Sequence, residues 1–294
     1  MTVEEFLKNL LESQNLLPKQ EAALEANKKE VTDFLRAEFG AAPVIKYAGS
    51  HAKGTAIRES YDLDIVCYFP STDTRTLKEI RDDVSAHLNK RYLMQDKSSA
   101  ERITNLKNAS APSGYHIDVV PGKFIEGSKD VFLHVAYGDK ERMQTNLKTH
   151  IDQVANSGCV DVIRLAKLWN CRNNMDIKTF VLEIFVVRAL TGSRNKSNPK
   201  AAFREVLGAM KDQFGMLQLV DPANKANIVS QLISPSHRVM VAKTAEEAWK
   251  KVSQSDNLAN WKSVFREESS DSGLTFIPPS KSNPIHNPSG QWAW

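Results

Sequence analysis

The chain has 294 residues, of which 41% are hydrophobic and 25% are charged, and its formal net charge is +4. This balance is that of a folded globular protein; it excludes wholesale disorder, fibres and DNA wrapping, but allows a local basic cleft for phosphates. The three cysteines form no CxxC pair and no apolar run reaches about 20 residues, so we expect a cytoplasmic protein without disulfides, zinc site or membrane span.

Residues 1–40 are predicted to form two helices that brace the rest of the molecule. Apolar residues recur at helical spacing between residues 3 and 15. Pro18 opens a second helix, which is expected to end before Gly40.

Residues 41–144 are predicted to form a core in which strands outnumber helices. The stretch 63–69 (LDIVCYF) is almost entirely apolar, which is typical of a buried strand. The expected strands are 43–48, 63–69, 103–108, 115–120 and 131–135, and the expected helix is 74–93.

From residue 145 to residue 268 the pattern changes to consecutive helices, and the tail 269–294 is expected to be extended. The predicted fold class is therefore α+β, a mixed sheet with helices followed by a helical lobe. The expected helices are 145–155, 157–172, 178–191, 199–213, 226–233, 240–253 and 256–268.

The most informative stretch joins the first two predicted strands. Gly49 would let the backbone approach a phosphate group, and the Ser50 hydroxyl can donate a hydrogen bond to it. Asp62 and Asp64 are two residues apart at a strand, so their carboxylates point to the same side. Such like charges repel each other unless a cation lies between them, and Mg²⁺ prefers carboxylate oxygens.

A third acid, Asp118, lies in the predicted strand 115–120. If that strand pairs beside 63–69, its carboxylate joins those of Asp62 and Asp64. Three carboxylates suit phosphoryl transfer with two ions, Mg²⁺ or Mn²⁺, one at the attacking hydroxyl and one at the triphosphate. An isolated Asp-x-Asp pattern is usually a solvated turn, but the combination with a Gly-Ser turn, an apolar strand and a later acid favours catalysis.

At these residues the sequence resembles the polymerase-β-like nucleotidyltransferase superfamily, whose motif is a Gly-Ser, an acidic pair and a third acid on a later strand. Three later segments resemble the branch of oligoadenylate synthetase and cyclic GMP-AMP synthase, and their order looks most like the bacterial CD-NTases. The resemblance covers about residues 40–265 and implies a polymerase-β-like core with a C-terminal helical lobe. The three segments are 157–170 (SGCVDVIRLAKLWN), 178–183 (KTFVLE) and 220–227 (VDPANKAN).

The resemblance also implies roles around the bound nucleotide. Lys167 matches a lysine that contacts the triphosphate, and Thr179 matches a hydroxyl on the phosphate side. Phe180 matches an aromatic residue that stacks on the base, although the family more often has Ser-Tyr where this chain has Thr179-Phe180. Phe180 can equally be a core residue. By residue type alone, Lys53 and Thr55 can reach phosphate oxygens, or Lys53 can be a surface residue.

The expected function is a metal-dependent nucleotidyltransferase that joins NTPs and releases pyrophosphate. The resemblance implies a cyclic oligonucleotide second messenger, containing adenine, in anti-phage defence. It also implies ATP among the substrates, an activating or regulatory protein partner, and a downstream effector that binds the product.

Two alternatives stay open. One is nucleotide transfer to RNA, as in CCA or poly(A) addition, or to a protein; the small net charge argues against an RNA-modifying enzyme with a broad basic surface. The other is a catalytically dead nucleotide-binding module, which should have lost one of the acids or the Gly-Ser, and all of these are present.

Overall fold

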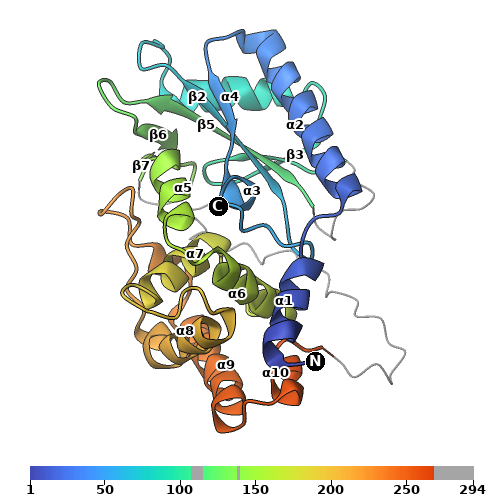
Figure 1. The fold of residues 1–294 in the computed structure, drawn as a ribbon. Helices are drawn as coiled ribbons and strands as arrows, with labels where there is room; N and C mark the ends of the chain where they lie inside the picture. The colour runs from blue at the N-terminus through green and yellow to red at the C-terminus, as the bar shows by residue number, and fades with distance from the viewer. Residues whose placement is uncertain (107–114, 138–139, 268–294) are drawn as a thin grey trace.

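The computed structural model describes residues 1–106, 115–137 and 140–267, so the predicted tail 269–294 lies outside the described residues. In Figure 1 a sheet with helices packed on it forms the upper half of the molecule, and a group of helices forms the lower half. None of the helices described is both long enough and apolar enough to cross a membrane.

Two helices open the chain and pack against different halves. Helix α1 (Val3–Ser13) begins after Thr2, whose side chain and backbone exchange hydrogen bonds with the backbone and side chain of Glu5. Helix α2 (Pro18–Phe39) has proline in its first position, where the missing N–H costs no hydrogen bond. The apolar face of α1 belongs to the helical core and that of α2 to the core under the sheet, so the two helices tie the halves together.

Within the described residues, seven strands form one mixed sheet. Five of them follow the order β1-β2-β5-β4-β3, with β6 paired to β5 and β7 paired to β6. Strands β2 and β5 are parallel, and the other pairs are antiparallel. The strands are β1 (Val44–Tyr47), β2 (Leu63–Phe69), β3 (Met94–Asp96), β4 (Glu101–Ile103), β5 (Ile117–Phe124), β6 (Val131–His134) and β7 (Arg142–Thr145), and the helices among them are α3 (Gly49–Ala52) and α4 (Leu77–Leu88).

The two faces of the sheet are covered by different elements, as strand β2 shows. Leu63 and Ile65 point into the core that α2 and α4 cover. Val66 and Tyr68 point to the other face, into a smaller cluster with side chains of β6 and β7. Because side chains alternate along a strand, Asp64 lies on the same face as Val66. Its carboxylate is thus at the edge of an apolar cluster rather than in open solvent.

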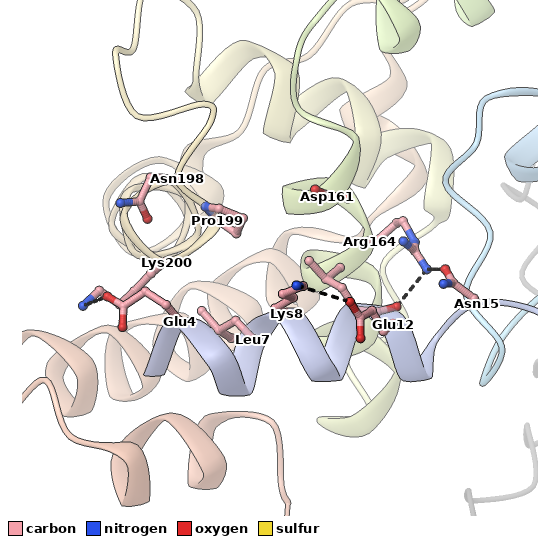
Figure 2. A pocket seen from close by; sticks show the side chains of 11 residues that line it. Glu4, Leu7, Lys8, Glu12, Asn15, Asp161, Arg164, Asn198, Pro199 and Lys200 are labelled. Carbon is pink, nitrogen blue, oxygen red and sulfur yellow. Dashed lines mark hydrogen bonds and ion pairs between the residues drawn. The ribbon is translucent and has the colours of Figure 1, made fainter. Parts of the chain in front are cut away.

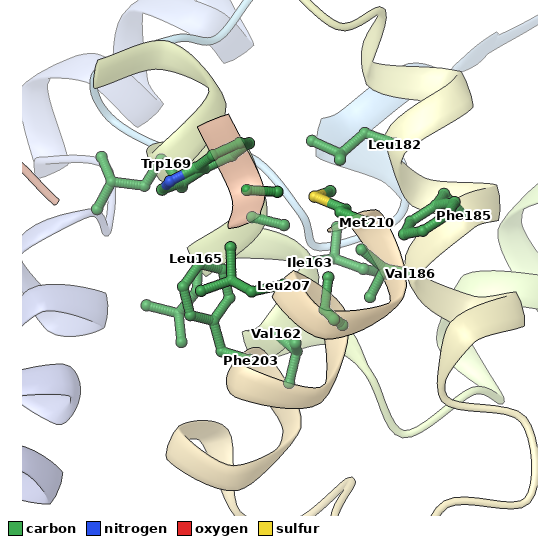
Figure 3. Close-up of a cluster of buried hydrophobic side chains, with 14 of the residues drawn as sticks. Val162, Ile163, Leu165, Trp169, Leu182, Phe185, Val186, Phe203, Leu207 and Met210 are labelled. Atoms are coloured by element: carbon green, nitrogen blue, oxygen red, sulfur yellow. The ribbon is translucent and has the colours of Figure 1, made fainter. Parts of the chain in front are cut away.

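The helical half encloses the larger core, part of which Figure 3 shows. Trp169 of α6, Phe185 of α7 and Phe203 of α8 are each 1% exposed there. Helix α7 runs through this core, which explains why its sequence is apolar on nearly every side. The elements are α5 (Leu147–Ala155), α6 (Val160–Arg172), α7 (Thr179–Ala189), α8 (Pro199–Gln213), α9 (Pro235–Gln254) and α10 (Leu258–Val264), with 3₁₀ turns η1 (Phe214–Met216) and η2 (Val229–Leu232).

The sheet differs from the prediction at its short strands. The sequence predicts neither β3 nor β7, because strands of three or four residues show too little alternation. Of the strand expected at 103–108, residues 107–108 lie outside the described residues, and the strand described at its start is Glu101–Ile103. Strand β5 continues past Val120 to Phe124, because β2 runs beside it in continuous parallel register.

The helical half differs at one predicted element. The helix expected at 226–233 is a 3₁₀ turn, Val229–Leu232. The preceding backbone is closed on itself, since the N–H of Asp221 donates to the carbonyl oxygen of Asn227 at 2.9 Å. This closed turn leaves no straight segment from which a longer helix could start.

Candidate active site

One row of polar side chains crosses the sheet from β2 to β4. The parallel register pairs Asp64 with Asp118, and the antiparallel register pairs Asp118 with Arg102. Directly paired residues on neighbouring strands share a face. Asp62 immediately precedes β2 and is two residues from Asp64. The structure therefore brings the three predicted carboxylates together.

Asp64 is the most deeply perturbed acid of this group. It is 6% exposed, and burial raises its pKa well above its ordinary range. The charges of Asp62 and Asp118 raise this pKa further, while those of Lys53 and Arg102 only partly offset the effect. A cation bound beside Asp64 would relieve both the burial cost and the repulsion.

Asp118 is held by two neighbouring side chains. Arg102 donates from Nε to Oδ1 and from Nη2 to Oδ2, both over 2.7 Å. The Nε2 atom of His116 lies 3.6 Å from Oδ2 of Asp118 and 3.4 Å from Oδ2 of Asp62. Burial alone would raise the pKa of Asp118, but the hydrogen bonds from Arg102 and His116 outweigh it and lower that pKa. Asp118 is therefore held in its charged form.

The predicted Gly-Ser turn lies directly against Asp64. The N–H of Ala48 donates to the backbone carbonyl of Asp64 at 2.9 Å. Gly49 has a φ of +62°, and a Cβ atom built there would stand 1.7 Å from Oδ2 of Asp64. Both the backbone conformation and the close approach require glycine. Ser50 follows as a buried residue in the short helix α3.

A buried polar network behind this turn joins the sheet to α6 and α7. Nζ of Lys53 and the hydroxyl of Thr55 donate to the two carboxylate oxygens of Glu183, at 2.8 and 2.6 Å. Nζ of Lys167 donates to the backbone carbonyl of Thr55 at 2.9 Å. Burial lowers the pKa of Lys167, an effect that the charge of Glu183 opposes.

This network shows where two of the predicted phosphate-binding residues, Lys53 and Lys167, lie. Lys53 is 7% exposed, so it is not the surface residue that its sequence position also allowed. Lys53 and Lys167 both lie near the carboxylate of Glu183, and both lie within electrostatic reach of Asp64. The two buried ammonium groups act on each other beside the turn, and together they would attract a further anion such as a phosphate.

The first two residues of α7, Thr179 and Phe180, differ in how deeply they are buried. Thr179 is half-buried. Phe180 is 2% exposed, with its ring edge-to-face against His150 at 4.9 Å between centroids. Phe180 is thus a core residue, the second of the two interpretations that its sequence allowed. Its ring offers no open face on which a base could stack in this structure.

The donor set fits a hard divalent cation, because three carboxylates supply only oxygen ligands. The close contact of Gly49 with Asp64 and the burial of that acid fit a compact ion site at the turn. In the part of the chain that the structure describes, however, no three acidic, histidine or cysteine side chains already stand as an ion site. Consistent with this, both oxygens of Asp118 are occupied by Arg102.

A separate cavity of about 380 Å³ lies elsewhere, between α1 and the first turns of α6 and α8 (Figure 2). Leu7 and Leu11 line it together with charged residues, among them Arg164. Arg164 is tied there by a 2.8 Å hydrogen bond to the side chain of Asn15. None of the predicted site residues lines this cavity, so it is distinct from the carboxylate site.

Sequence reasoning missed three residues that shape the site. His116 stands two residues before Asp118, so the strand period could have placed it on the same face. Glu183 lies in the segment 178–183 that carries the family resemblance. Its partner Lys53, however, is 130 residues away in the sequence. Arg102 gave no signal, because only the pairing of β4 with β5 sets it beside Asp118.

The comparisons with known proteins bear on this geometry. The family model described as "Second Messenger Oligonucleotide or Dinucleotide Synthetase domain" matches residues 1–157. The chain is also 26% identical over 238 residues to a cyclic AMP-AMP-AMP synthase of Escherichia coli strain MS 115-1. That match covers 68% of this chain and 73% of the relative.

Solved structures share the fold. The CdnC:HORMA-deltaN complex of E. coli MS115-1 matches with a TM-score of 0.68 and 19% identity, over 90% of this chain and 97% of that chain. The CD-NTase CdnG of Bradyrhizobium diazoefficiens, solved in complex with GTP, matches with a TM-score of 0.70 and 12% identity, over 89% and 94%. The predicted fold class is thereby confirmed: a polymerase-β-like core of mixed sheet and helices, followed by a helical region.

Proposed function

Because the chain belongs to the family of second messenger oligonucleotide or dinucleotide synthetases, and is a nucleotidyltransferase that makes cyclic oligonucleotides, we propose that ATP is among its substrates and that its product contains adenine. The E. coli relative, which makes cyclic AMP-AMP-AMP, supports the choice of adenine. The observation that carries the proposed site is the pairing of Asp64 with Asp118 beside the Gly49 turn.

The proposed active site uses Asp62, Asp64 and Asp118 as ligands of two divalent cations, Mg²⁺ or Mn²⁺. When bound, such ions neutralise the triphosphate and lower the pKa of the attacking hydroxyl. The chain itself holds Asp118 charged through Arg102, and keeps Asp64 in contact with the Gly-Ser turn.

The donor triphosphate would lie over the turn, where Ser50 offers a hydroxyl. Lys53 and Lys167 lie buried behind it and act on each other, so they favour an anion at this place. The half-buried residue Thr179 stands at the start of α7, and we assign its hydroxyl to the phosphate side. Catalysis by this arrangement is positioning plus neutralisation of charge, and pyrophosphate leaves as the new ester forms.

The biological setting is part of the same proposal. We place the enzyme in the cytoplasm, where NTPs are available, as a source of second messenger in anti-phage defence with an effector that binds the product. The complex of the E. coli structural relative with HORMA-deltaN supports a regulatory protein partner. Transfer of nucleotides to RNA or to a protein, and a catalytically dead module, are not favoured, since the matched family makes small oligonucleotides.

The test is product analysis with purified full-length protein. The protein is incubated with the four NTPs and with Mg²⁺ or Mn²⁺, and each NTP in turn is labelled at its α-phosphate. Phosphatase then removes the terminal phosphates of NTPs and linear products. The labelled products that resist phosphatase are identified by mass. We expect a small phosphatase-resistant product that carries label from ATP. The double variant D62N/D64N should give none while keeping the circular dichroism spectrum of the parent.

Two outcomes would contradict the proposal. Label that appears on tRNA or on a protein, with no small cyclic product, would move the chain to the macromolecule-modifying class. Full activity in D62N/D64N would remove the two acids from the metal site.

A further inference from the structure

We propose that Arg102 is the exchange partner of the divalent cation at Asp118: its guanidinium holds this carboxylate in the metal-free enzyme and yields when the cation binds. This inference rests on the proposed function, because it takes Asp118 as a metal ligand. It makes Arg102 a positioning residue, which acts through Asp118 rather than on the nucleotide.

The first observation is that the contact satisfies both carboxylate oxygens at once. Nε and Nη2 of Arg102 reach Oδ1 and Oδ2 of Asp118 over 2.7 Å each, in the planar fork that guanidinium groups favour. Asp118 is 2% exposed, so solvent does not compete for these oxygens. In the described residues no three acids stand as a ready ion site, which agrees with an Asp118 already engaged.

The second observation is that Arg102 is more exposed and contacts fewer residues than the neighbouring Arg81. Arg81 is 7% exposed and donates to the Glu101 carboxylate and to the carbonyls of Lys97 and Ser98. The Arg102 side chain is 20% exposed and, among the described residues, hydrogen-bonds to Asp118. Breaking that one contact releases it toward solvent.

The third observation is the charge balance around the acids. Arg102 contacts Asp118, and the charges of Lys53 and Arg102 act on Asp64, so cationic side chains face the acids before any metal arrives. A divalent ion at Asp118 would stand beside the guanidinium and repel it. Coupling of this kind is reciprocal. The factor by which Arg102 weakens metal binding equals the factor by which the metal weakens the contact of Arg102 with Asp118.

The exchange has a use in the metal-free enzyme. A buried carboxylate without a counter-charge would take up a proton or destabilise the sheet. Arg102 prevents both, and it delivers Asp118 in its charged form at the place where a cation is needed. Completion of the active site is then the replacement of one cation by another.

The experiment measures Mn²⁺ binding without nucleotide, by the electron paramagnetic resonance signal of free Mn²⁺, for the full-length chain and for R102Q, R102K, D118N and R102Q/D118N. We expect R102Q to bind Mn²⁺ about ten-fold more tightly, the change that one charge-assisted contact typically gives. R102K keeps the charge but loses the fork, so it should show a smaller gain. D118N should bind more weakly, and R102Q/D118N should bind no more tightly than D118N.

Equal or weaker Mn²⁺ affinity in R102Q, or a gain that survives in R102Q/D118N, would overturn the inference. Thermal unfolding checks that each variant is folded; if R102Q is not, the comparison of R102K with the parent chain decides by the same criterion. Failure of the proposed function looks different. In that case D62N/D64N binds Mn²⁺ as well as the parent does, whatever Arg102 contributes.

Discussion

Lys53 and Glu183 are 130 residues apart in the chain, yet Nζ of the lysine lies 2.8 Å from Oε2 of the glutamate, with both side chains buried. Lys53 follows the Gly-Ser turn, and Glu183 belongs to the central helix of the other half. The pair therefore fixes the phosphate-side turn against α7. This contact joins the two halves of the molecule beside the proposed active site.

Glu183→Gln should strongly destabilise the protein. The variant leaves the buried ammonium of Lys53 without the carboxylate it is paired with, and breaking a buried ion pair in this way costs about 3–5 kcal/mol. The matched control is Glu246→Gln, which breaks the exposed 2.6 Å pair with Lys250 and should destabilise the protein far less, because solvent screens exposed ion pairs. Urea unfolding followed by circular dichroism measures both, and equal losses in the two variants would contradict the prediction.

The same carboxylate predicts a pH dependence. Burial would raise the pKa of Glu183, but the charges of Lys53 and Lys167 outweigh it and lower the pKa below its ordinary 4.5. The stability that this charge contributes is thus fully present above pH 4.5 and is lost as pH falls through the lowered pKa. The difference in unfolding free energy between the parent and Glu183→Gln should shrink over that acid range. A difference that stays constant from neutral to acid pH would show that the charge of Glu183 is not what stabilises the fold.

Gly49→Ala should abolish most NTP turnover. The new Cβ atom would meet Oδ2 of Asp64 at 1.7 Å and push the turn away from the carboxylate, and a displacement of about 1 Å can cost about a hundred-fold in rate. Gly127→Ala is the control, since Gly127 has a similar φ of +69° but no atom within 4 Å of the new Cβ. Backbone strain should affect the stability of both variants, whereas only Gly49→Ala introduces the clash with Asp64. A comparison of steady-state turnover in the two variants therefore separates the effect of the clash from that of strain. Similar turnover in both would mean that the contact with Asp64 is not needed.

Tyr68→Phe should leave the protein as stable or make it more stable. The hydroxyl of Tyr68 is buried without a hydrogen-bond partner among the described residues, and burial raises its pKa. Removing an unsatisfied buried hydroxyl relieves a cost of about 1–3 kcal/mol. Tyr115→Phe should do the opposite, because the Tyr115 hydroxyl accepts a 3.2 Å hydrogen bond from Asn27. Thermal unfolding of both variants tests the pair, and a lower melting temperature for Tyr68→Phe would count against it.

The sequence predicts the part of the site that follows from strand period and local turns. Asp62 and Asp64 share a face because they are two residues apart, and the apolar stretch after them identifies the strand on which they stand. Asp118 was expected to join them if its strand paired beside 63–69, and the parallel register does pair it with Asp64. The sequence also singles out Gly49, but for the approach of a phosphate, whereas the structure shows that a Cβ atom there would meet Asp64.

What the sequence does not predict depends on contacts between distant segments. Arg102 reaches Asp118 because a three-residue strand pairs with β5, and so short a strand carries no visible alternation. The roles expected for Phe180 and Lys167 come from the family resemblance of two helical segments. This resemblance does not tell whether either side chain is buried. The structure buries both, one in the apolar core and one behind the turn. Burial of single helical residues depends on what packs against them, which periodicity alone leaves open.

The site draws its residues from distant parts of the chain, and this sets an order of events during synthesis. The ribosome completes Asp62 and Asp64 first, Asp118 later and Glu183 later still, while domains fold as their chain emerges. Contacts between such distant segments form slowly. A nascent chain that stops before α7 therefore has the acidic pair and the Gly-Ser turn, but not the carboxylate that anchors Lys53 and Thr55. We therefore expect a chain whose translation stops before this helix to be inactive, so that product comes only from chains translated past it.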